Sequence, residues 1–561
     1  MMKRVFTLYA LVAILVVATY ASDRTESQMR AIASQQLFKA SSRGTAPTAK
    51  NLTLELKDSH LSLYSAEGRG FVVVSRDNTF PAVLGTSATA IDMKNLPDGF
   101  RWWLTEANKS MQRRLETNEW YTTRSPMAVE PFLTTKWDQG TPFNLKCPKT
   151  GTSYYPTGCV ATAAAQIMKY YNYPEQGEGV AKYTKDKLPR TKTIEGVYDW
   201  ANMKDRYANN MTDMTPEVEA VSTLMADVGA ACNMTYTINY GGASLTDCAS
   251  GLIHHLKYDS LSLRAMYRVF FSDSEWEDMI YNELLNKRPI LYCGMPDDGS
   301  SGHAFVFHGL DADGKVYVNW GWSGICDGYF DFNVLLPGKE AKQHGNFSFH
   351  SQMIYNFNPT QTPAEGTEEQ TVWITDTLSY FSIDKDSLVL HACGIYNYNY
   401  RYFKGKLIVA LENTNGVDDD SFHYILYDTE DEKDGGAIEM YYGFVFNNED
   451  RNQYGQETIC YLKNDEIKPG TYIVTLASQG LYESHISPMR YYGGVKCQAK
   501  LVKGADGKIE LTDYTASGIT PVAYHPATSP RIYDLQGHNL GTNPSALRKG
   551  IYIKDGKKVA K

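Results

Sequence analysis

The stretch Tyr155-Pro-Thr-Gly-Cys-Val-Ala-Thr-Ala-Ala-Ala-Gln-Ile-Met-Lys-Tyr-Tyr171 runs from a turn into a helix. Its Pro-Thr-Gly segment is typical of a turn, and the alanine-rich run that follows favours helix. The helix presents Cys159 at its N-terminal end. Apolar residues recur at the helical period, so one face is expected to lie in a core; they are Val160, Ala164, Ile167, Met168 and Tyr171.

The N-terminal end of a helix changes the chemistry of a cysteine. Unpaired N–H groups and the positive end of the helix dipole favour a thiolate, and the thiolate is the nucleophilic form. A free cysteine is also common as a small buried side chain at the start of a core helix. Cys159 alone therefore leaves both interpretations open, and the rest of the chain has to decide between them.

Length and composition indicate a globular chain of several domains. The 561 residues suggest roughly three or four domains, and an apolar fraction of 43% provides ample core. The 40 Tyr and 44 Gly favour β-rich parts. Because the net charge is −9 and no basic run is present, nucleic acid is excluded as a partner.

Residues 1–21 have the pattern of a secretory signal peptide. Lys3 and Arg4 form a basic start, an apolar run covers 5–17, and Thr19-Tyr-Ala21 offers a cleavage site. The apolar run is shorter than the ~20 residues that span a bilayer, and no second long apolar segment follows. The mature chain is therefore expected to be exported as a soluble protein, secreted or held at the cell surface.

Nine cysteines are spread thinly along the chain, at 147, 159, 232, 248, 293, 326, 393, 460 and 497. Export permits disulfides, and the odd number leaves at least one free thiol. No CxxC pair is present, so structural zinc is not expected, and no metal or organic cofactor is predicted. The spacing alone assigns no disulfide.

The order of the expected elements indicates an α+β fold with a β-rich extension. A first unit, 22–125, combines helical composition at 27–39, β-rich runs at 71–75 and 82–84, and an aromatic-rich helix from Phe100. A second unit, 126–358, begins with helices and continues with antiparallel strands, which argues against a parallel doubly wound sheet. Its expected helices are 159–172, 215–231 and 274–286, and its strands are 289–294, 303–309, 316–320 and 329–332.

A Thr/Pro/Glu/Gly-rich linker, 359–370, separates the β-rich part from the second unit. Short strands recur from 371 to 525, which is typical of a β-sandwich; examples are 388–390, 405–410 and 470–475. Acidic loops between the strands carry potential calcium ligands, although solvated turns have the same composition. A final segment, 526–561, holds two or three short strands.

A cysteine nucleophile needs an imidazole that takes its proton, and the imidazole needs an acceptor that orients it. His303 and His308 lie in one expected strand, whose alternation puts them on opposite faces, so at most one of them faces Cys159. His303 follows Ser301 and Gly302 at the strand start, where a substrate or a backbone segment can approach closely. We therefore select His303 as the general base, and Ser301 and Gly302 as substrate-binding residues.

The strand after His303 supplies the orienting groups. The side-chain carbonyl of Asn319 can accept the imidazole N–H, and Trp320 can shield that bond from water. Upstream, the carboxamide of Gln139 and the backbone N–H of Cys159 would form an oxyanion hole. The order Gln, Cys, His, Asn, with 144 residues from Cys159 to His303, matches the papain-type arrangement.

Longer motifs resemble the streptopain family of papain-like cysteine peptidases. They follow the family order through the second unit: Thr135-Lys-Trp-Asp-Gln-Gly-Thr-Pro-Phe-Asn144, Thr157-Gly-Cys-Val-Ala-Thr-Ala-Ala-Ala-Gln-Ile-Met-Lys-Tyr170, Asn239-Tyr-Gly-Gly-Ala-Ser244, Gly302-His-Ala-Phe-Val306, Val318-Asn-Trp-Gly-Trp322 and Asp327-Gly-Tyr-Phe330. The resemblance implies a papain-like fold with Cys159 as nucleophile, His303 as general base, Gln139 as oxyanion donor, and Asn319 and Trp320 as support for the histidine. The sequence departs from the family pattern at Phe307-His308, where an aliphatic or acidic residue is expected.

The first unit is similar to the family's propeptide at 70–75, 82–85 and 96–100. This similarity implies that residues 22–125 fold against the enzyme, keep His303 from pairing with Cys159 and are removed by proteolysis. The cut is expected between Asn118 and Val129, with Arg124 as a candidate.

The segment 526–561 resembles C-terminal segments of secreted proteins from Bacteroidetes-type bacteria, which often mark export or surface attachment. A plain β-hairpin at the end of the preceding domain has the same pattern.

These observations predict a secreted cysteine endopeptidase, made as a zymogen, that hydrolyses protein or peptide substrates without a cofactor. Two alternatives stay open. Another papain-like thiol acyl transferase, such as a transglutaminase or an amidase, would use the same residues. A surface adhesin would bind host protein or glycan through its C-terminal β-rich half, but the joint presence of Gln139, Cys159, His303 and Asn319 argues against an inert peptidase unit.

Overall fold

The structure is a computed structural model. It describes residues 23–38, 51–117, 124–237, 241–260, 262–295, 302–335, 351–359, 373–374, 379–385, 387–392, 395–397, 402–414, 421–431, 436–438, 443–444, 458–462, 467–481, 486–491, 494–513, 532–533, 551–554 and 557–560. The predicted signal peptide 1–21 and nearly all of the predicted linker 359–370 lie outside these residues, as does most of the segment 526–561. Within the described residues, no helix is both long and apolar enough to span a lipid bilayer.

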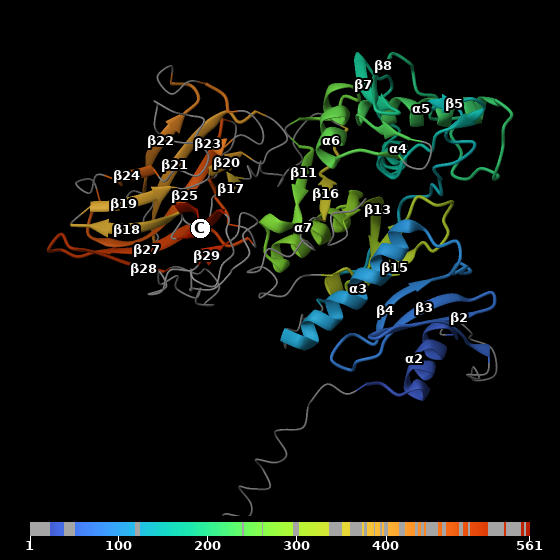
Figure 1. Cartoon of the computed structure of the whole chain (residues 1–561), viewed down its shortest axis with the longest axis horizontal. Coiled ribbons are helices and arrows are strands. Elements are labelled where there is room, and N and C mark those ends of the chain that lie inside the picture. The colour runs from blue at the N-terminus through green and yellow to red at the C-terminus, as the bar shows by residue number, and fades with distance from the viewer. Residues whose placement is uncertain are drawn as a thin grey trace, which may run out of the picture.

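A ten-stranded sheet connects the first two predicted units (Figure 1). Every neighbouring pair in it is antiparallel, in the order β1-β2-β3-β4-β15-β14-β13-β12-β16-β11. Its strands are β1 (Thr53–Lys57), β2 (Leu61–Ala66), β3 (Gly70–Ser75), β4 (Val83–Ser87), β11 (Arg264–Tyr267), β12 (Ile290–Gly294), β13 (His303–Leu310), β14 (Val316–Asn319), β15 (Gly328–Phe330) and β16 (Gln352–Tyr355).

The seam between the two units lies where β4 pairs with β15. Gly328 pairs with Ser87, and Phe330 pairs with Gly85. The Ser87 hydroxyl also donates to the backbone carbonyl of Asp327 at 2.6 Å. Residues of the first unit therefore continue the sheet of the second unit through backbone hydrogen bonds, rather than resting on it as a separate layer.

Helices cover the two faces of this sheet, and β13 contributes side chains to both. Ala304 and Val306 join the core that α4 (Cys159–Tyr171), α5 (Pro216–Ala231) and α6 (Leu245–His254) build. Phe305 and Phe307 join the other core, with α3 (Asp98–Thr117) and α7 (Asp273–Leu285). Alternate residues of one strand thus face different helices, as the two-residue period of a strand requires.

Most of the expected elements are confirmed, within one or two residues at most ends. The three helices of the second unit, its four strands and the aromatic-rich helix of the first unit are all present. The sequence reasoning missed α6, the strands β1, β2, β11 and β16 of the ten-stranded sheet, and the hairpin of β7 (Val180–Lys185) and β8 (Leu188–Thr193). That hairpin is mostly polar and largely exposed, so it lacks the apolar alternation that identifies a half-buried strand.

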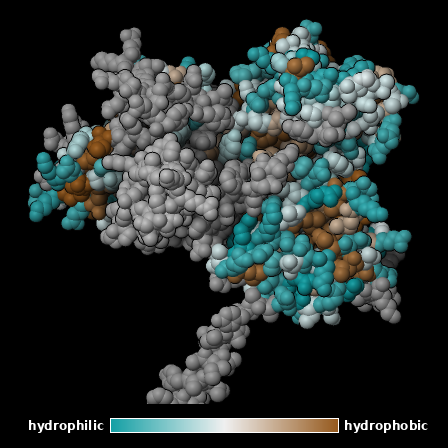
Figure 2. Space-filling model, in the orientation of Figure 1, coloured by the Kyte–Doolittle hydropathy of each residue, from teal (hydrophilic) through white to brown (hydrophobic). Residues whose placement is uncertain are grey.

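The C-terminal part is built from short antiparallel sheets, as the sandwich prediction requires. A sheet of β18 (Tyr380–Asp384), β19 (Ser387–Ala392) and β24 (Thr458–Leu462) shares one core with a larger sheet around β21 (Gly405–Asn413) and β25 (Gly470–Gly480). The other strands of the larger sheet are β22 (Phe422–Asp428), β26 (Ser487–Pro488), β27 (Gln498–Lys503) and β28 (Ile509–Asp513). Figure 2 shows that mainly polar side chains cover the described surface on the side viewed, with smaller hydrophobic patches between them.

Ion pairs at Glu275 tie the described residues of this β-rich part to the second unit, since both Arg490 and Lys496 lie within ion-pair distance of its carboxylate. The Arg490 guanidinium donates to both carboxylate oxygens of Glu275, at 3.0 and 2.9 Å, and lies 5.1 Å from the ring centroid of Phe271. Gly494 packs directly on the backbone here, because a Cβ at that position would lie 2.3 Å from the Ser272 nitrogen. The first turn of α7 is therefore an interface as well as a helix start.

The seam between β4 and β15 can be tested with Gly328→Ala. A Cβ at Gly328 would lie 2.0 Å from the Thr86 carbonyl oxygen, which belongs to the first unit. We expect the substitution to lower the free energy of unfolding of the full chain by about 1–3 kcal/mol, because a backbone atom cannot move aside cheaply. Urea unfolding, measured in a Cys159→Ala background, would show this loss.

Gly196→Ala is the matched control, since its added Cβ meets its nearest neighbour, Thr223, only at 4.0 Å. In a chain that lacks residues 1–117, Gly328→Ala and Gly196→Ala should have the same free energy of unfolding, because the Thr86 carbonyl oxygen that clashes with the added Cβ is then absent. An equal loss from Gly328→Ala with and without the first unit would contradict the seam.

Candidate active site

Cys159 begins α4 directly after a glycine that no other residue could replace without strain. Gly158 has φ = 86°, and a Cβ there would lie 2.0 Å from the Met234 Cε and 3.1 Å from the Gly241 carbonyl oxygen. The turn thus places Met234 and Gly241 against the residue before the cysteine. Cys159 is half-buried at the helix N-terminus, where the sequence predicted it.

His303 is the first residue of β13, and its neighbour links it to the cysteine. The Ala304 backbone N–H donates to the Cys159 thiol, which brings the strand start to the start of α4. Strand alternation groups His303 with Phe305 on the face that α3 covers, whereas Cys159 lies on the α4 face. His303 therefore comes close to Cys159 because it stands at the start of the strand, which is the position for which the sequence argument selected it, although its strand face is the one that α3 covers.

The thiol and the imidazole do not form a hydrogen bond with each other in the described structure. Burial raises the pKa of the Cys159 thiol, which outweighs the N–H groups that lower it. Burial lowers the pKa of His303, and the Asp98 carboxylate partly opposes that shift. Both shifts favour the neutral thiol and the neutral imidazole over the ion pair that a thiol peptidase uses.

The start of α3 lies over the end of β13 that carries His303. Asp98 is close enough to act electrostatically on both His303 and Cys159. The backbone at Gly99 lies against Phe305 and Trp320, since a Cβ there would come within 3.1 and 2.9 Å of their rings. The first unit therefore contributes a carboxylate and a close backbone contact to the candidate site.

Gln139 lies beside the turn that precedes Cys159. Its backbone carbonyl accepts a hydrogen bond from the Thr157 N–H at 3.0 Å, and its own N–H donates to the Asp138 carboxylate at 2.6 Å. The Asp138 carboxylate also accepts from the Ser323 hydroxyl at 2.9 Å. The Gln139 backbone is thus fixed near the nucleophile, as an oxyanion donor would require.

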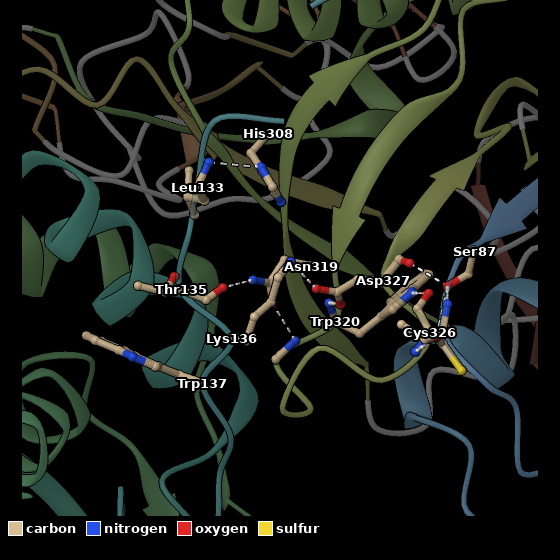
Figure 3. A network of polar contacts seen from close by, with 12 residues as sticks. Ser87, Leu133, Thr135, Lys136, Trp137, His308, Asn319, Trp320, Cys326 and Asp327 are labelled. Atoms are coloured by element: carbon tan, nitrogen blue, oxygen red, sulfur yellow. Dashed lines mark hydrogen bonds and ion pairs between the residues drawn. The ribbon is translucent and has the colours of Figure 1, made fainter. Parts of the chain in front are cut away.

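Asn319 is fully buried and bonds to groups other than His303 (Figure 3). Its side-chain nitrogen donates to the Thr135 carbonyl at 2.8 Å and to the Gln166 side chain at 3.0 Å. Its side-chain oxygen accepts from the Gly321 N–H at 2.9 Å and from Gln166 at 3.2 Å. The predicted acceptor role toward the imidazole is therefore not realised in this conformation, because strand alternation turns Asn319 toward α4.

Trp320 points to the opposite face from Asn319 and packs in the aromatic core. Its ring lies 4.8 Å from that of Phe305, and its indole N–H donates to the Cys326 carbonyl at 3.0 Å. Its backbone N–H donates to the Asp327 carboxylate at 3.0 Å, and Lys136 pairs with that carboxylate at 2.6 Å. A buried ion pair thus holds the turn that carries Trp320.

Ser301, one of the two predicted substrate-binding residues, lies outside the described residues. Gly302, the other, is packed closely against protein atoms. A Cβ at Gly302 would lie 2.2 Å from the Met295 sulfur and 2.8 Å from the Gly294 carbonyl oxygen. The close approach predicted for this glycine is therefore to the neighbouring strand β12.

His308 is fully buried, away from Cys159, between the rings of Phe132 and Tyr317. Its Nδ1 accepts a hydrogen bond from the Leu133 N–H at 3.1 Å. Burial, and next the nearby Lys136 charge, lower the pKa of His308 to about 3. The departure from the family pattern at this position is thus a neutral structural histidine.

Sequence reasoning missed three residues that the structure brings to the site. Gln166 is buried in α4 and joins Asn319; its signal was a long polar side chain within an apolar helix. Asp98 lies in the stretch 96–100 that is similar to the family's propeptide, but nothing local pointed it toward Cys159. Asp327 was quoted only as part of a motif, because its pairing with Lys136 spans 191 positions of the chain.

In the part of the chain that the structure describes, no three His, Cys, Asp or Glu side chains lie together as metal ligands would.

Comparisons with known proteins show which family the chain resembles. The Peptidase C10 family matches residues 137–330. Streptopain from Streptococcus pyogenes is 32% identical over 338 residues, which cover 55% of this chain and 83% of streptopain. The thiol protease/hemagglutinin PrtT from Porphyromonas gingivalis is 33% identical over 327 residues, covering 54% of this chain and 37% of PrtT. A solved fragment of prointerpain A from Prevotella intermedia is 33% identical, with a TM-score of 0.48, and covers 54% of this chain and 98% of the fragment.

An α+β fold with a thiol at a helix start beside a strand-end histidine defines a papain-like cysteine peptidase. The chain belongs to the Peptidase C10 family, a family of cysteine-type peptidases that includes streptopain. The resemblance drawn from the sequence motifs is thereby confirmed. The chain spans only 37% of the length of PrtT, one of its curated relatives.

The Gln166–Asn319 pair can be tested with Gln166→Leu. The change leaves the Trp137 N–H and the Asn319 amide short of partners in a fully buried place. We expect a loss of about 2–4 kcal/mol in the free energy of unfolding, since each unsatisfied buried polar group costs ~1–3 kcal/mol. The measurement is urea unfolding in the Cys159→Ala background.

Gln176→Leu serves as the control, because Gln176 is exposed and makes one hydrogen bond to a backbone carbonyl. It should change stability by no more than about 0.5 kcal/mol. If both variants lost the same free energy of unfolding, the buried Gln166–Asn319 pair would contribute no more to stability than an exposed glutamine does.

His308 predicts a pH dependence of stability. Its folded pKa of about 3 lies below its ordinary value of 6.5, so the folded chain binds the proton less tightly than the unfolded chain does. Its contribution is therefore complete above pH 6.5 and is lost as the pH falls toward 3, by up to roughly 4–5 kcal/mol. Urea midpoints measured at several pH values across that window would report it.

His308→Asn is the informative variant, because its side-chain oxygen can still accept from the Leu133 N–H but cannot take up a proton at these pH values. Between pH 3 and 6.5 the free energy of unfolding of this variant should fall less than that of the parent. Above pH 7 the two proteins should show the same pH dependence. If the variant lost as much stability as the parent between pH 6.5 and 3, the role of His308 would be contradicted.

Proposed function

We propose that the chain is the exported, latent precursor of a cysteine endopeptidase. Residues 22 to about 120 act as an intramolecular inhibitor that proteolysis removes. The observation that carries this proposal is the position of α3, whose first residues lie over the strand end that bears His303 and bring Asp98 near both reacting groups. The signal-like segment 1–21 supports export, to the medium or to the cell surface.

In the mature enzyme, His303 takes the proton of Cys159 and the resulting thiolate attacks the peptide carbonyl carbon. The developing oxyanion accepts hydrogen bonds from the Gln139 side chain and the Cys159 backbone N–H. The imidazolium then protonates the leaving amine, which departs and leaves an acyl-enzyme. Water, deprotonated by His303, hydrolyses the thioester and restores the thiol.

Latency has an electrostatic cause in this proposal. While α3 covers the strand end, burial disfavours both the thiolate and the imidazolium, so the reactive pair does not form. Removal of the first unit lets water and substrate reach Cys159 and His303, and it removes the Asp98 carboxylate. Asn319 and Trp320 then support the strand end from its two faces.

We place the maturation cut on the N-terminal side of Arg124. The Arg124 guanidinium pairs with Glu277 at 2.8 Å and also contacts Asp278, both on α7. A few residues later, Val129 pairs with Leu310 of β13. Arg124 thus serves as an anchor for the new N-terminus, and not as the residue that is cleaved.

The decisive comparison is between the full chain and its Cys159→Ala and His303→Ala variants, refolded under reducing conditions. We expect the parent to lose its first unit and gain casein-hydrolysing activity, while Cys159→Ala stays intact and inert. His303→Ala should lower kcat/KM by about 10⁴-fold, because it removes the general base. Gln139→Ala should lower kcat by about 10²–10³-fold with a smaller effect on KM.

Mass spectrometry over time identifies the new N-terminus. A terminus between residues 118 and 124 would agree with the proposed cut, and one beyond Arg124 would contradict it. Activity in Cys159→Ala after removal of the first unit by an added protease would overturn the assignment of the nucleophile.

Two alternative functions have less support than this proposal. A thiol acyl transferase would share Cys159 and His303, and amine incorporation into a peptide substrate would reveal it in the same assay. No described contact favours an adhesin role for the β-rich part over a structural one.

A further inference from the structure

Two cysteines outside the candidate active site lie with their sulfur atoms in contact. The Sγ atoms of Cys232 and Cys248 are 3.0 Å apart, and both residues are fully buried. Cys232 caps the C-terminus of α5, and Cys248 lies in the first turns of α6. Figure 1 shows α5 and α6 grouped beside α4, the helix that carries Cys159.

The backbone around this pair is built for close approach. A Cβ at Gly251 would lie 2.0 Å from the Ala231 carbonyl oxygen, so glycine lets α6 come up against the end of α5. Ser244 caps α6 by accepting from the Asp247 N–H at 3.0 Å, which fixes the turn that leads to Cys248. Both cysteines are therefore held at helix ends whose separation is set by the backbone.

The geometry points to a disulfide between Cys232 and Cys248. The sulfurs need to move together by only about 1 Å to reach the bonded distance of ~2.05 Å. Among the described cysteines this is the one pair with sulfur-to-sulfur contact; Cys293, for example, contacts a methionine sulfur and a carbonyl oxygen instead. An exported chain meets oxidising conditions, so the inference rests in vivo on the proposed export.

The bond forms by thiol–disulfide exchange with an external disulfide, such as oxidised glutathione or a dithiol–disulfide oxidoreductase. One cysteine loses its proton, and its thiolate attacks that disulfide, giving a mixed disulfide and releasing one thiol. The second thiolate attacks the mixed disulfide, forms the internal bond and releases the second thiol. Two electrons and two protons pass to the oxidant, and the step occurs during folding, before both sulfurs are buried.

The bridge would close a loop that touches the active site. Residues 232–248 include Met234 and Gly241, the two residues against which Gly158 packs directly before the nucleophile. A covalent link at the two ends of this segment restrains the wall beside Cys159. Because both sulfurs are buried, a dilute thiol that keeps Cys159 reduced leaves the bridge intact in the folded enzyme.

The first test uses the Cys159→Ala full chain, refolded with a mixture of reduced and oxidised glutathione, then unfolded and alkylated without reduction. Eight cysteines remain in that variant, and we expect six to be alkylated before reduction and all eight after it. Peptide mapping should find the peptides of Cys232 and Cys248 joined. Full alkylation before reduction, or a bridge between other cysteines, would overturn the proposal.

The second test follows the thermal unfolding of the same protein with and without a strong reductant applied during refolding. The bridge should raise the midpoint of the peptidase unit by roughly 5–10 °C, as expected for a loop of this length. A Cys232→Ala/Cys248→Ala double variant should not respond to the reductant. Cys147→Ala, which removes another buried thiol of the same core, should keep the full response.

These readouts separate the bridge from the rest of the proposed function. They use an inactive variant, so they do not depend on peptidase activity, and refolding in glutathione does not depend on export. A chain that forms the bridge in vitro but is found reduced and unprocessed inside cells would contradict export alone. If the double variant fails to fold, the alkylation count and the peptide map still decide the question.

Discussion

Side chains of strand β13 pack with α4 on one face of the sheet and with α3 on the other face. The arrangement of the candidate site depends on this division. Its even-numbered side chains, Ala304 and Val306, pack with α4, which begins at the nucleophile. Its odd-numbered side chains, Phe305 and Phe307, pack with the aromatic core that includes α3. Because side chains alternate along a strand, His303 approaches Cys159 through its position at the start of β13, next to Ala304, and not through the face that packs on α4.

The same geometry brings one helix of the first unit near both Cys159 and His303. A helix laid over the odd face of β13 necessarily approaches His303, and its first turn also lies near Cys159. The cost of charging either group rises with burial, so a cover that excludes water disfavours the thiolate–imidazolium pair. The cover is held by backbone pairing of β4 with β15, and the Ser87 hydroxyl adds a hydrogen bond to the Asp327 carbonyl at the same seam.

At the end of the neighbouring strand, β14, successive side chains again point to the two opposite faces of the sheet. Asn319 turns toward α4 and exchanges two hydrogen bonds with Gln166, whereas Trp320 turns toward α3 and packs on Phe305. Buried polar groups of this kind cost stability when unpaired and define one arrangement when paired. The Lys136–Asp327 ion pair fixes the turn after Trp320 in the same way, because the Asp327 carboxylate also accepts the Trp320 N–H.

The sequence by itself determined the family, the α+β class and the principal helices and strands of the peptidase unit, because these depend on local periodicity and on motifs read in order. From the same motifs it proposed Cys159 and His303 as the reacting pair. It also predicted Gln139 beside the nucleophile. Only the tertiary structure decided which groups each side chain meets. Strand faces turned Asn319 away from His303, packing brought Asp98 and Gln166 to the site, and backbone approach at Gly251 set Cys232 against Cys248. Those contacts join residues far apart in the chain, and no local pattern records a distance between two faces of a sheet.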